Sequence, residues 1–187
     1  MGHSQAEKAE NRERILAEAS RKVRRDGLES VSVGTLMKSV GLTHGGFYGH
    51  FESRSALLAE ALERALLEGE AKAKVPGSDR PRAFAHIVRS YLSRSHRDAR
   101  DSGCAIAALV SDVGRAEASS REVMTDHIET FIAQVAETLG GDEDGAIVAV
   151  SAMVGALALS RVVTDPARSD AFLKAVRDHL RTFEAGS

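Results

Sequence analysis

The sequence predicts an all-α protein of about nine helices. Of its 187 residues, 43% are hydrophobic and 28% are charged, but only 4% are aromatic and none is Trp. The apolar content is therefore mostly Ala, Leu and Val. Ala and Leu are strong helix formers, whereas strands favour aromatic and β-branched residues. Apolar residues also recur with the helical period along almost the whole chain, so helices are expected from end to end.

Cap and turn signals divide the first third of the chain into four predicted helices. Gly27 ends the first helix as a C-cap would, and Ser32 stands at the N-cap position of the second. Gly41 breaks the second helix, and Thr43 offers an N-cap for a third. The apolar positions of these helices lie within residues 15–23, 33–40, 43–50 and 54–66.

The rest of the chain continues the helical pattern. Val75 to Asp79 form a predicted loop, and Asp165-Pro166 form a turn before the last helix. The fourth helix is expected to extend to residue 74, and the other helices are expected at 80–97, 104–112, 120–139 and 145–163, with a last one over Phe172 to Phe183. The segment 146–160 is nearly all apolar, but it is shorter than the roughly 20 residues of a membrane span. A buried or interface helix is the better interpretation.

Two short helices joined by Gly41-Leu42-Thr43 form a helix-turn-helix pattern. Gly41 suits the turn because it tolerates a positive φ. The second helix would direct its first residues, Thr43 to Gly46, at the major groove of DNA, where its N-terminus also favours phosphate. Glycines are poor helix residues, and they make sense here if the backbone closely approaches another surface. The pattern alone leaves open a connector without function, since many helical hairpins contain Gly in the turn.

The segment from Ser32 to Leu57 resembles the DNA-binding signature of the TetR family of repressors. The features in common are a hydroxyl cap, Gly41-Leu42-Thr43, a stretch of small residues and Tyr48-Gly49-His50-Phe51. The resemblance is specific over roughly 45 residues, from Ile15 to Leu58. It implies an N-terminal three-helix DNA-binding domain over residues 1–53. A larger helical ligand-binding and dimerisation domain would follow over 54–187.

The resemblance also implies a role for each residue that matches the motif. Phe47 and Phe51 would hold the helices together, and His44 has the one obvious side chain for a base edge. Gly46 and Gly49 depart from the family pattern, which leaves the operator sequence open. The implied DNA-binding set is Ser32, Val33, Thr43, His44, Gly45, Gly46, Tyr48, His50 and Arg54; of these, Ser32, Thr43, Tyr48, His50 and Arg54 would contact phosphate.

The larger second part would hold a small-molecule effector and the dimer interface. An alternative for every ligand candidate is a plain core role, because buried apolar residues usually serve packing alone. The helix at 145–163 is too apolar for a surface helix, and with the last helix it would form a four-helix interface with a second subunit. The alternative is packing within one core. The ligand candidates are Tyr91, Cys104, Leu109, His127 and Phe131, and the interface candidates are Ala152, Gly155, Ala156, Phe172, Val176 and Leu180.

These features together predict a cytoplasmic homodimeric repressor, released from a palindromic double-stranded DNA operator by an unidentified small-molecule effector. No catalytic residue, metal site, cofactor or membrane partner is expected. The single cysteine excludes a disulfide framework, and no secretory signal precedes the first helix. Two alternatives remain. One is a helical enzyme that pairs Cys104 with His127 or His96, and the other is a helical interaction module using the same hairpin for protein contacts.

Overall fold

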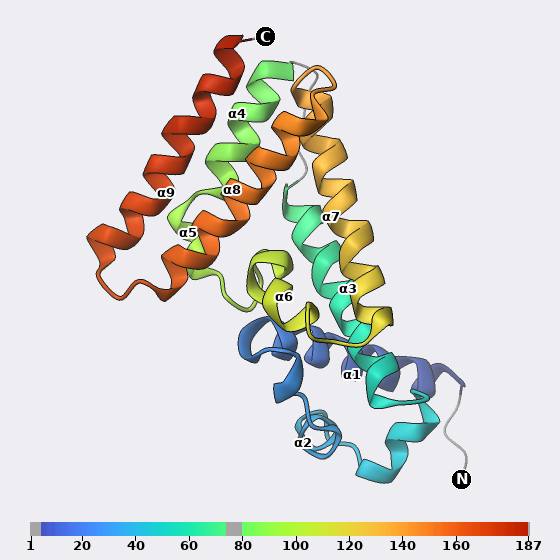
Figure 1. Ribbon diagram of the computed structural model, residues 1–187. Coiled ribbons are helices and arrows are strands. Elements are labelled where there is room, and N and C mark those ends of the chain that lie inside the picture. The colour runs from blue at the N-terminus through green and yellow to red at the C-terminus, as the bar shows by residue number, and fades with distance from the viewer. Residues whose placement is uncertain (1–4, 74–79, 187) are drawn as a thin grey trace.

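The computed structural model describes residues 5–73 and 80–186, and these residues are almost entirely helical (Figure 1). Within them there are nine α-helices, three short 3₁₀ segments and no strand, which confirms the predicted all-α fold. The predicted loop at 75–79 lies outside the described residues. The α-helices are α1 Gln5–Asp26, α2 Val33–Ser39, α3 Arg54–Ala73, α4 Arg80–Tyr91, α5 Arg94–Asp98, α6 Ala105–Val113, α7 Ala118–Thr138, α8 Glu143–Val162 and α9 Pro166–Leu180; the 3₁₀ segments are η1 Leu28–Ser30, η2 His44–Gly49 and η3 Arg181–Gly186.

The helices form two hydrophobic cores. In Figure 1, α1, α2 and α6 of the first core lie below α4, α8 and α9 of the second. The lower core joins α1, α2, η2, α3 and α6, and it includes Ile15, Phe47 and Leu57, all fully buried. The upper core joins α4, α7, α8 and α9 around Met153 and Leu157. The predicted domain boundary after residue 53 falls at the start of α3, yet α3 itself packs into the lower core. The boundary therefore stays a prediction.

The turn between α2 and η2 has the backbone geometry that the sequence predicts. Gly41 has φ +74°, the left-handed conformation that residues with a Cβ rarely adopt. The N–H of Leu42 donates to the carbonyl of Met37 at 2.8 Å, and the N–H of Gly41 donates to that of Lys38 at 3.1 Å. These bonds satisfy the last carbonyls of α2 and reverse the chain. At the other end of α2, the Ser32 hydroxyl accepts the Thr35 N–H at 3.4 Å, as its N-cap position predicts.

The segment after this turn is a 3₁₀ helix, where the sequence predicts a short α-helix. Thr43 has an extended backbone in front of η2, but its side chain makes no capping hydrogen bond, so the expected N-cap bond is also absent. The physical reason is composition. Three of the six residues of η2 are glycines, and each costs about 1 kcal/mol in an α-helix relative to Ala.

The single helix predicted over 80–97 is interrupted in the structure. α4 ends at Tyr91, and α5 begins after Ser93, whose hydroxyl accepts the His96 N–H at 3.2 Å. A Ser that caps a helix in this way starts a new helix instead of continuing the old one. The break places the α5–α6 connection beside the upper end of α3.

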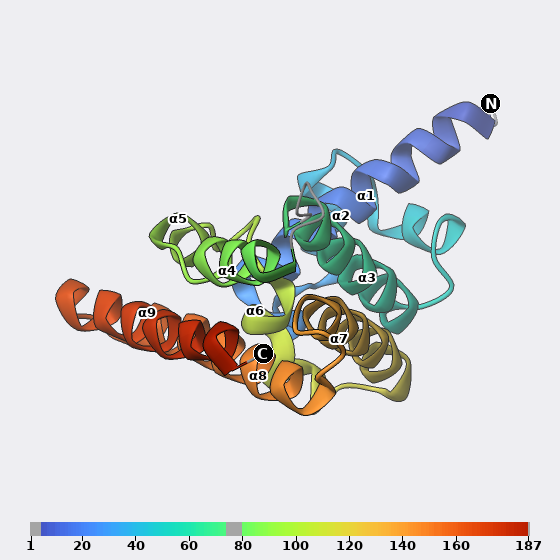
Figure 2. The ribbon, with the colours of Figure 1, turned by 90° about the horizontal axis from the view of Figure 1, so that it is seen from above.

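Helix α8 is apolar on two sides. Among the described residues it is the one helix long and apolar enough, by length and composition, to cross a membrane, and 39% of that apolar window is buried within the chain. Ala149, Met153 and Leu157 lie fully inside the upper core. The opposite side exposes Val148, Leu159 and Val162. Figure 2 shows α8 and α9 together along one edge of the molecule, seen from above.

Replacing Gly41 by Ala should lower the free energy of unfolding by about 1–2 kcal/mol, because Ala is strained at a positive φ. Urea denaturation measures the change. Gly45→Ala is the matched control: Gly45 has no positive φ, and a Cβ there would have no atom within 4 Å. The control should be neutral or stabilising by up to about 1 kcal/mol. Equal effects of the two substitutions would contradict the strained turn.

Candidate nucleic-acid interface and cavity

The helix-turn-helix presents polar and aromatic side chains on a rigid aromatic base. Phe47 and Phe51 are buried, with ring centroids 5.7 Å apart, which confirms their predicted scaffold role. Tyr48 packs edge-on against Phe47 at 5.3 Å, but it is 68% exposed, far more than a core aromatic would be. Ser32, Thr43 and His44 are exposed as well. Much of the predicted DNA-binding set is thus solvent-accessible.

The glycines of η2 are not required by packing within the protein. A Cβ added at Gly45 or Gly49 would meet no atom within 4 Å, and one at Gly46 would meet Thr43 Oγ1 at an ordinary 3.5 Å. All three glycines are exposed. If glycine is required at these positions, the requirement comes from a surface outside the chain that approaches the backbone.

Other members of the predicted set are held partly inside the protein. Val33 is half-buried against the lower core, and His50 is half-buried at the end of η2, where its N–H donates to the Phe47 carbonyl at 2.9 Å. A Cβ on Gly34 would lie 3.7 Å from Cδ2 of His44, so the His44 ring rests beside the first turn of α2.

Arg54 has a structural role that its sequence position does not reveal. Its Nε donates to the Val31 carbonyl at 2.9 Å, and its Nη2 donates to the Leu28 carbonyl at 3.2 Å and contacts Glu29 at 3.4 Å. The guanidinium therefore ties the start of α3 to the η1–α2 connection. The prediction of Arg54 as a phosphate anchor is corrected in one respect. Much of the hydrogen-bond donor capacity of its guanidinium is used within the protein.

Arginines of α1 fix the helix-turn-helix from the other side, which sequence reasoning missed. Arg14 donates to the Val40 carbonyl at 2.5 Å, directly at the turn. The guanidinium of Arg12 lies 4.7 Å from the centre of the Phe51 ring and pairs with Glu60. These partners are 26 to 48 residues apart in sequence, so no local pattern signals them.

A network of ion pairs joins α1 to the upper half of α3. The buried Arg24 pairs with Glu68, and Arg64 pairs with both Glu68 and Glu13. Partial burial acts to raise the pKa of the Glu68 carboxyl, but the hydrogen bonds from Arg64 and Arg24 outweigh it and hold that pKa below its usual range. Glu68 is therefore ionised near neutral pH, and the network is charged on both sides.

A cavity of about 280 Å³ lies between α3, α4, α6 and α7, beside the α5–α6 connection. Four of the five predicted ligand residues line it: Tyr91, Cys104, His127 and Phe131. Leu109 does not line it, so its prediction gains no support from this cavity. Leu109 follows Cys104 by five residues, which turns it about 140° around a helix. Its side chain is buried in the lower core.

Tyr91, His96 and Cys104 form a hydrogen-bonded cluster at one end of this cavity. The Tyr91 hydroxyl donates to Sγ of Cys104 at 3.0 Å. The His96 ring contacts the Tyr91 carbonyl through Nδ1 at 2.7 Å, and its Nε2 accepts the Cys104 N–H at 3.0 Å. This pattern requires a neutral imidazole with the proton on Nδ1. Burial raises the pKa of Tyr91 well above its usual range, so its hydroxyl stays protonated.

The cluster argues against one of the two pairings in the predicted enzyme alternative, that of Cys104 with His96. His96 uses Nε2 for the backbone of Cys104, so this nitrogen is not available as a base for the thiol.

Cys104 also has a basic neighbour that is distant in sequence. Arg161 of α8 interacts electrostatically with Cys104 and donates to the carbonyls of Arg97 and His96. Desolvation by burial lowers the pKa of Arg161, and attraction from Cys104 and Tyr91 partly offsets this. In the part of the chain that the structure describes, no cluster of metal-ligating side chains occurs.

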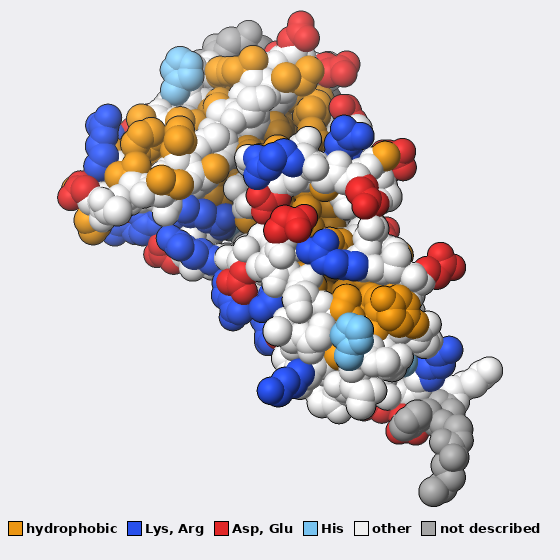
Figure 3. Space-filling view, turned by 60° about the horizontal axis from the view of Figure 1, so that its bottom comes forward, with side chains coloured by type: hydrophobic (Ala, Val, Ile, Leu, Met, Phe, Trp, Pro, Cys, Tyr) orange, Lys and Arg blue, Asp and Glu red, His pale blue; other side chains and the backbone are white. Residues whose placement is uncertain are grey.

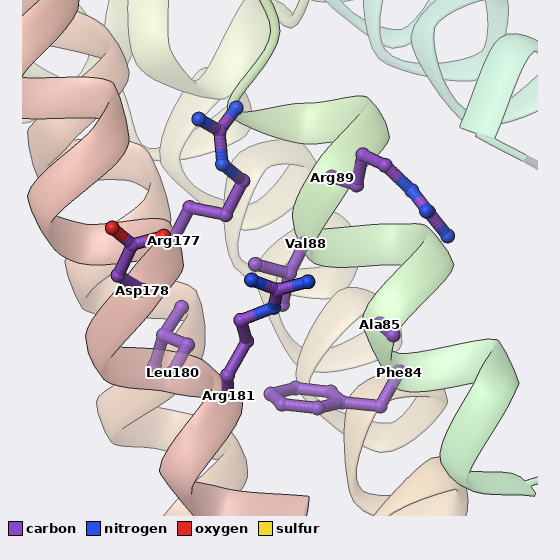
Figure 4. A pocket seen from close by; sticks show the side chains of 8 residues that line it. All are labelled: Phe84, Ala85, Val88, Arg89, Arg177, Asp178, Leu180 and Arg181. Atoms are coloured by element: carbon purple, nitrogen blue, oxygen red, sulfur yellow. The ribbon is translucent and has the colours of Figure 1, made fainter.

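A second, smaller hollow of about 190 Å³ lies on the surface between α4 and α9 (Figure 4). Phe84, Val88 and Leu180 form its apolar floor, and Arg177 of α9 and Arg181 of η3 extend toward α4. Arg177 donates to the Leu92 carbonyl at 3.4 Å, which ties it to the end of α4. No residue predicted for ligand binding lies here.

The predicted dimer residues divide into two groups. Ala152, Gly155, Phe172 and Val176 are partly exposed. Ala156 and Leu180 are 4% and 1% exposed and belong to the upper core, so both are corrected to core residues with little surface to offer a second subunit. The exposed stripe of α8 consists of Val148, Ala152, Gly155, Leu159 and Val162, spaced by four and three residues. Hydrophobic side chains also gather on the upper part of the face in Figure 3.

The same segment that forms the candidate interface matches a known family. Residues 15–61 match the family model described as "Bacterial regulatory proteins, tetR family". This range contains every residue of the predicted DNA-binding set. The HTH-type transcriptional regulator AcrR of Shigella flexneri is 33% identical over 99 residues, which cover 49% of this chain and 46% of that protein. The matched stretch thus spans about half the length of this curated relative.

Several solved structures share the fold over almost the whole chain. A TetR transcriptional regulator from Chloroflexus aurantiacus J-10-FL superposes with a TM-score of 0.81 at 18% identity, covering 98% of each chain. NemR of E. coli in its reduced form has a TM-score of 0.77 at 18% identity, covering 92% of this chain and 96% of its own. SCO4454 of Streptomyces coelicolor, a TetR-family transcriptional regulator, has a TM-score of 0.71 at 23% identity, covering 94% and 97%.

The fold and the interface together define a helix-turn-helix protein with a larger helical body. Residues 15–61 carry the sequence of the TetR family of bacterial regulatory proteins, as the signature from Ser32 to Leu57 predicts, and the whole chain has the fold of the solved TetR-family regulators.

Arg54→Ala should lower the free energy of unfolding by about 1–2 kcal/mol, because it removes hydrogen bonds to two carbonyls. Arg54→Lys should restore less than half of the loss, since an ammonium lacks the guanidinium fork. Urea denaturation measures both. Arg121→Ala, at an exposed arginine of α7, is the control and should stay within about 0.5 kcal/mol of the wild type. An unchanged stability of Arg54→Ala would contradict the structural role of this residue.

Proposed function

We propose that the protein is a transcriptional repressor that binds a palindromic DNA operator as a homodimer and is released by a small-molecule effector. The observation that carries DNA binding is the exposed rim of Ser32, Thr43, His44 and Tyr48 above the buried Phe47 and Phe51, within the family match. Regulators of this family are non-enzymatic transcription factors. Action in the cytoplasm, without a cofactor, belongs to the same proposal.

Within this proposal the hydroxyl and aromatic side chains position the protein on phosphates, and few side chains contact bases. Ser32 and Thr43 stand at the starts of α2 and η2, and Tyr48 projects from η2. Such contacts fix register but carry little sequence information. His44 is the candidate for a base edge, and Gly45 and Gly46 admit the backbone. His50 and Arg54, both partly held within the protein, would add the remaining phosphate contacts.

A homodimer would place two such interfaces one DNA turn apart, about 34–36 Å, as a palindrome requires. The uncovered apolar stripe of α8 and the neighbouring Phe172 and Val176 of α9 support this interface. A two-fold interface uses the same patch on both subunits, so α8 and α9 of each chain would form a four-helix bundle. Gly155 has no atom within 4 Å of an added Cβ, which permits close approach of a second helix.

The proposed effector cavity is linked to the helix-turn-helix through α6. The N-terminal end of α6 follows Cys104 at the cavity. Near its other end, Asp112 accepts the Leu28 N–H at 3.3 Å, at the junction after α1. An effector that favours a different position of α6 would shift the population toward dimers whose interfaces are mis-spaced for DNA.

Tyr48→Phe should weaken binding to operator and non-operator duplexes alike, by about tenfold, because it removes one hydrogen bond to a charged phosphate. Operator candidates come from selection on genomic DNA with the full-length protein, followed by fluorescence anisotropy at fixed salt. Thr125→Val, which removes an exposed hydroxyl from α7, is the control. If the protein retains no duplex even at low salt, DNA binding fails and the alternative of a protein-interaction module gains support.

Leu159→Asp should raise the dimer dissociation constant by about a hundredfold or more, because an unpaired charge would be buried between two apolar faces. Sedimentation velocity over a concentration series measures this constant. Leu67→Asp is the matched control, because Leu67 of α3 has nearly the same exposure, 51% against 53% for Leu159. Equal behaviour of both variants would place the subunit contact, if one forms, elsewhere than on α8.

A further inference from the structure

The cavity between α3, α4, α6 and α7 has a lining that restricts the charge of any occupant. None of the described side chains that line it belongs to Asp, Glu, Lys or Arg. Arg161 lies behind Gly103, with its donors directed to the His96 and Arg97 carbonyls. A charged molecule would lose its hydration here without gaining a counter-charge on the cavity wall. The lining therefore favours an uncharged occupant.

The size of the cavity restricts the occupant further. A volume of about 280 Å³ is the space of roughly nine water molecules at about 30 Å³ each. It lies just below the range for small-molecule pockets, about 300–1,000 Å³. Two fused rings with a substituent fill a space of this size.

One wall of the cavity is flat and aromatic. Tyr91 and Phe131 both line it, with ring centroids 5.5 Å apart and planes inclined by 25°. Tyr91 is nearly fully buried, but Phe131 is half-buried although it packs against both cores, so part of its ring stays uncovered. Aromatic rings gain most from a flat partner that stacks with an offset or edge-on.

The cluster of Tyr91, His96 and Cys104 lies at the end of this wall, and its Tyr91 hydroxyl is a hydrogen-bond donor with only a weak acceptor. The Tyr91 hydroxyl donates to Sγ of Cys104, and a thiol sulfur accepts hydrogen bonds poorly. A carbonyl oxygen at the same place would be a better acceptor. Ser102 and Gln134 also line the cavity and add polar edges around it.

From these observations we infer that the effector is an uncharged, flat molecule of about two fused rings, with a carbonyl-type acceptor at one edge. Its rings stack on Phe131, and its acceptor takes the Tyr91 hydroxyl from Cys104. This inference rests on the proposed function only in calling the cavity the effector site. The chemistry follows from the lining itself, so binding can be tested without DNA.

Three probes that share one skeleton separate the three requirements. Coumarin is flat, uncharged and carries one lactone carbonyl; octahydrocoumarin keeps the carbonyl but is puckered; coumarin-3-carboxylate keeps the flat ring but is charged. Isothermal titration of the full-length protein, without DNA, should show coumarin binding once per chain. Each of the other two should bind at least about tenfold more weakly, since each loses either the stacking or the favourable desolvation.

Substitutions of Tyr91 and Phe131 test which contacts each side chain makes with coumarin. Tyr91→Phe should weaken coumarin about five- to tenfold by removing one hydrogen bond. Phe131→Leu should weaken coumarin but not octahydrocoumarin, because only the flat ring stacks. Phe183→Leu, at a half-buried ring of η3 outside the cavity, is the matched control. Nuclear Overhauser contacts between coumarin and the Phe131 ring in the wild type test the same placement if a variant fails to fold.

The outcomes separate this inference from the proposed function. Tighter binding of coumarin-3-carboxylate, equal binding of octahydrocoumarin, or no coumarin binding up to millimolar concentration would each overturn the inference, whatever the protein does with DNA. If coumarin binds as described but leaves the affinity for the operator unchanged, the inferred chemistry stands and release by an effector fails.

Discussion

The packing of α3 against α1 is the contact on which both candidate sites depend. The lower half of α3 buries Leu57, Ala61 and Leu62 against α1 and the aromatic pair of the helix-turn-helix. Its upper half pairs with α1 through Glu68 and contributes Leu66 and Gly69 to the cavity wall. Because an apolar interface of this kind is close-packed, α3 cannot move at one end without the other responding. A single helix thus supports the exposed rim that would meet DNA and one wall of the space that would hold an effector.

The η2 segment combines a rigid base with a sparse surface. Phe47 and Phe51 fix its position, Arg14 holds the preceding turn, and Arg54 holds the loop before α2. Above this base, three of six residues lack side chains. A surface of this kind forms many backbone and phosphate contacts but few contacts with base edges. Sequence preference would then depend largely on the shape and deformability of the duplex and on the spacing of two half-sites.

The all-α fold, the N-cap at Ser32, the turn at Gly41 and the aromatic scaffold could be predicted from the sequence because each depends on residues close together in the chain. The features that could not be predicted depend on distant partners. Arg54 meets carbonyls of residues 28 and 31, and Arg161 meets those of residues 96 and 97, which no local pattern encodes. Leu109, Ala156 and Leu180 lie in the two cores, and apolar periodicity identifies such a buried face without saying which neighbour buries it. The α-helix expected at η2 failed because its glycines outweigh the helical pattern.

Gly103, at the end of the cavity beside Cys104, gives this protein one fixed boundary. A Cβ at that position would lie 2.4 Å from the Ala99 carbonyl oxygen and 3.0 Å from Nη2 of Arg161. The main chain at Ala99 and the guanidinium of Arg161 therefore close this end of the cavity. A side chain at residue 103 would require the α5–α6 connection to move. The remaining walls are made mainly of side chains from α3, α4, α5, α6 and α7. Divergence toward a new effector would proceed from the α4 and α7 side, while the backbone at Gly103 keeps the depth of the cavity constant.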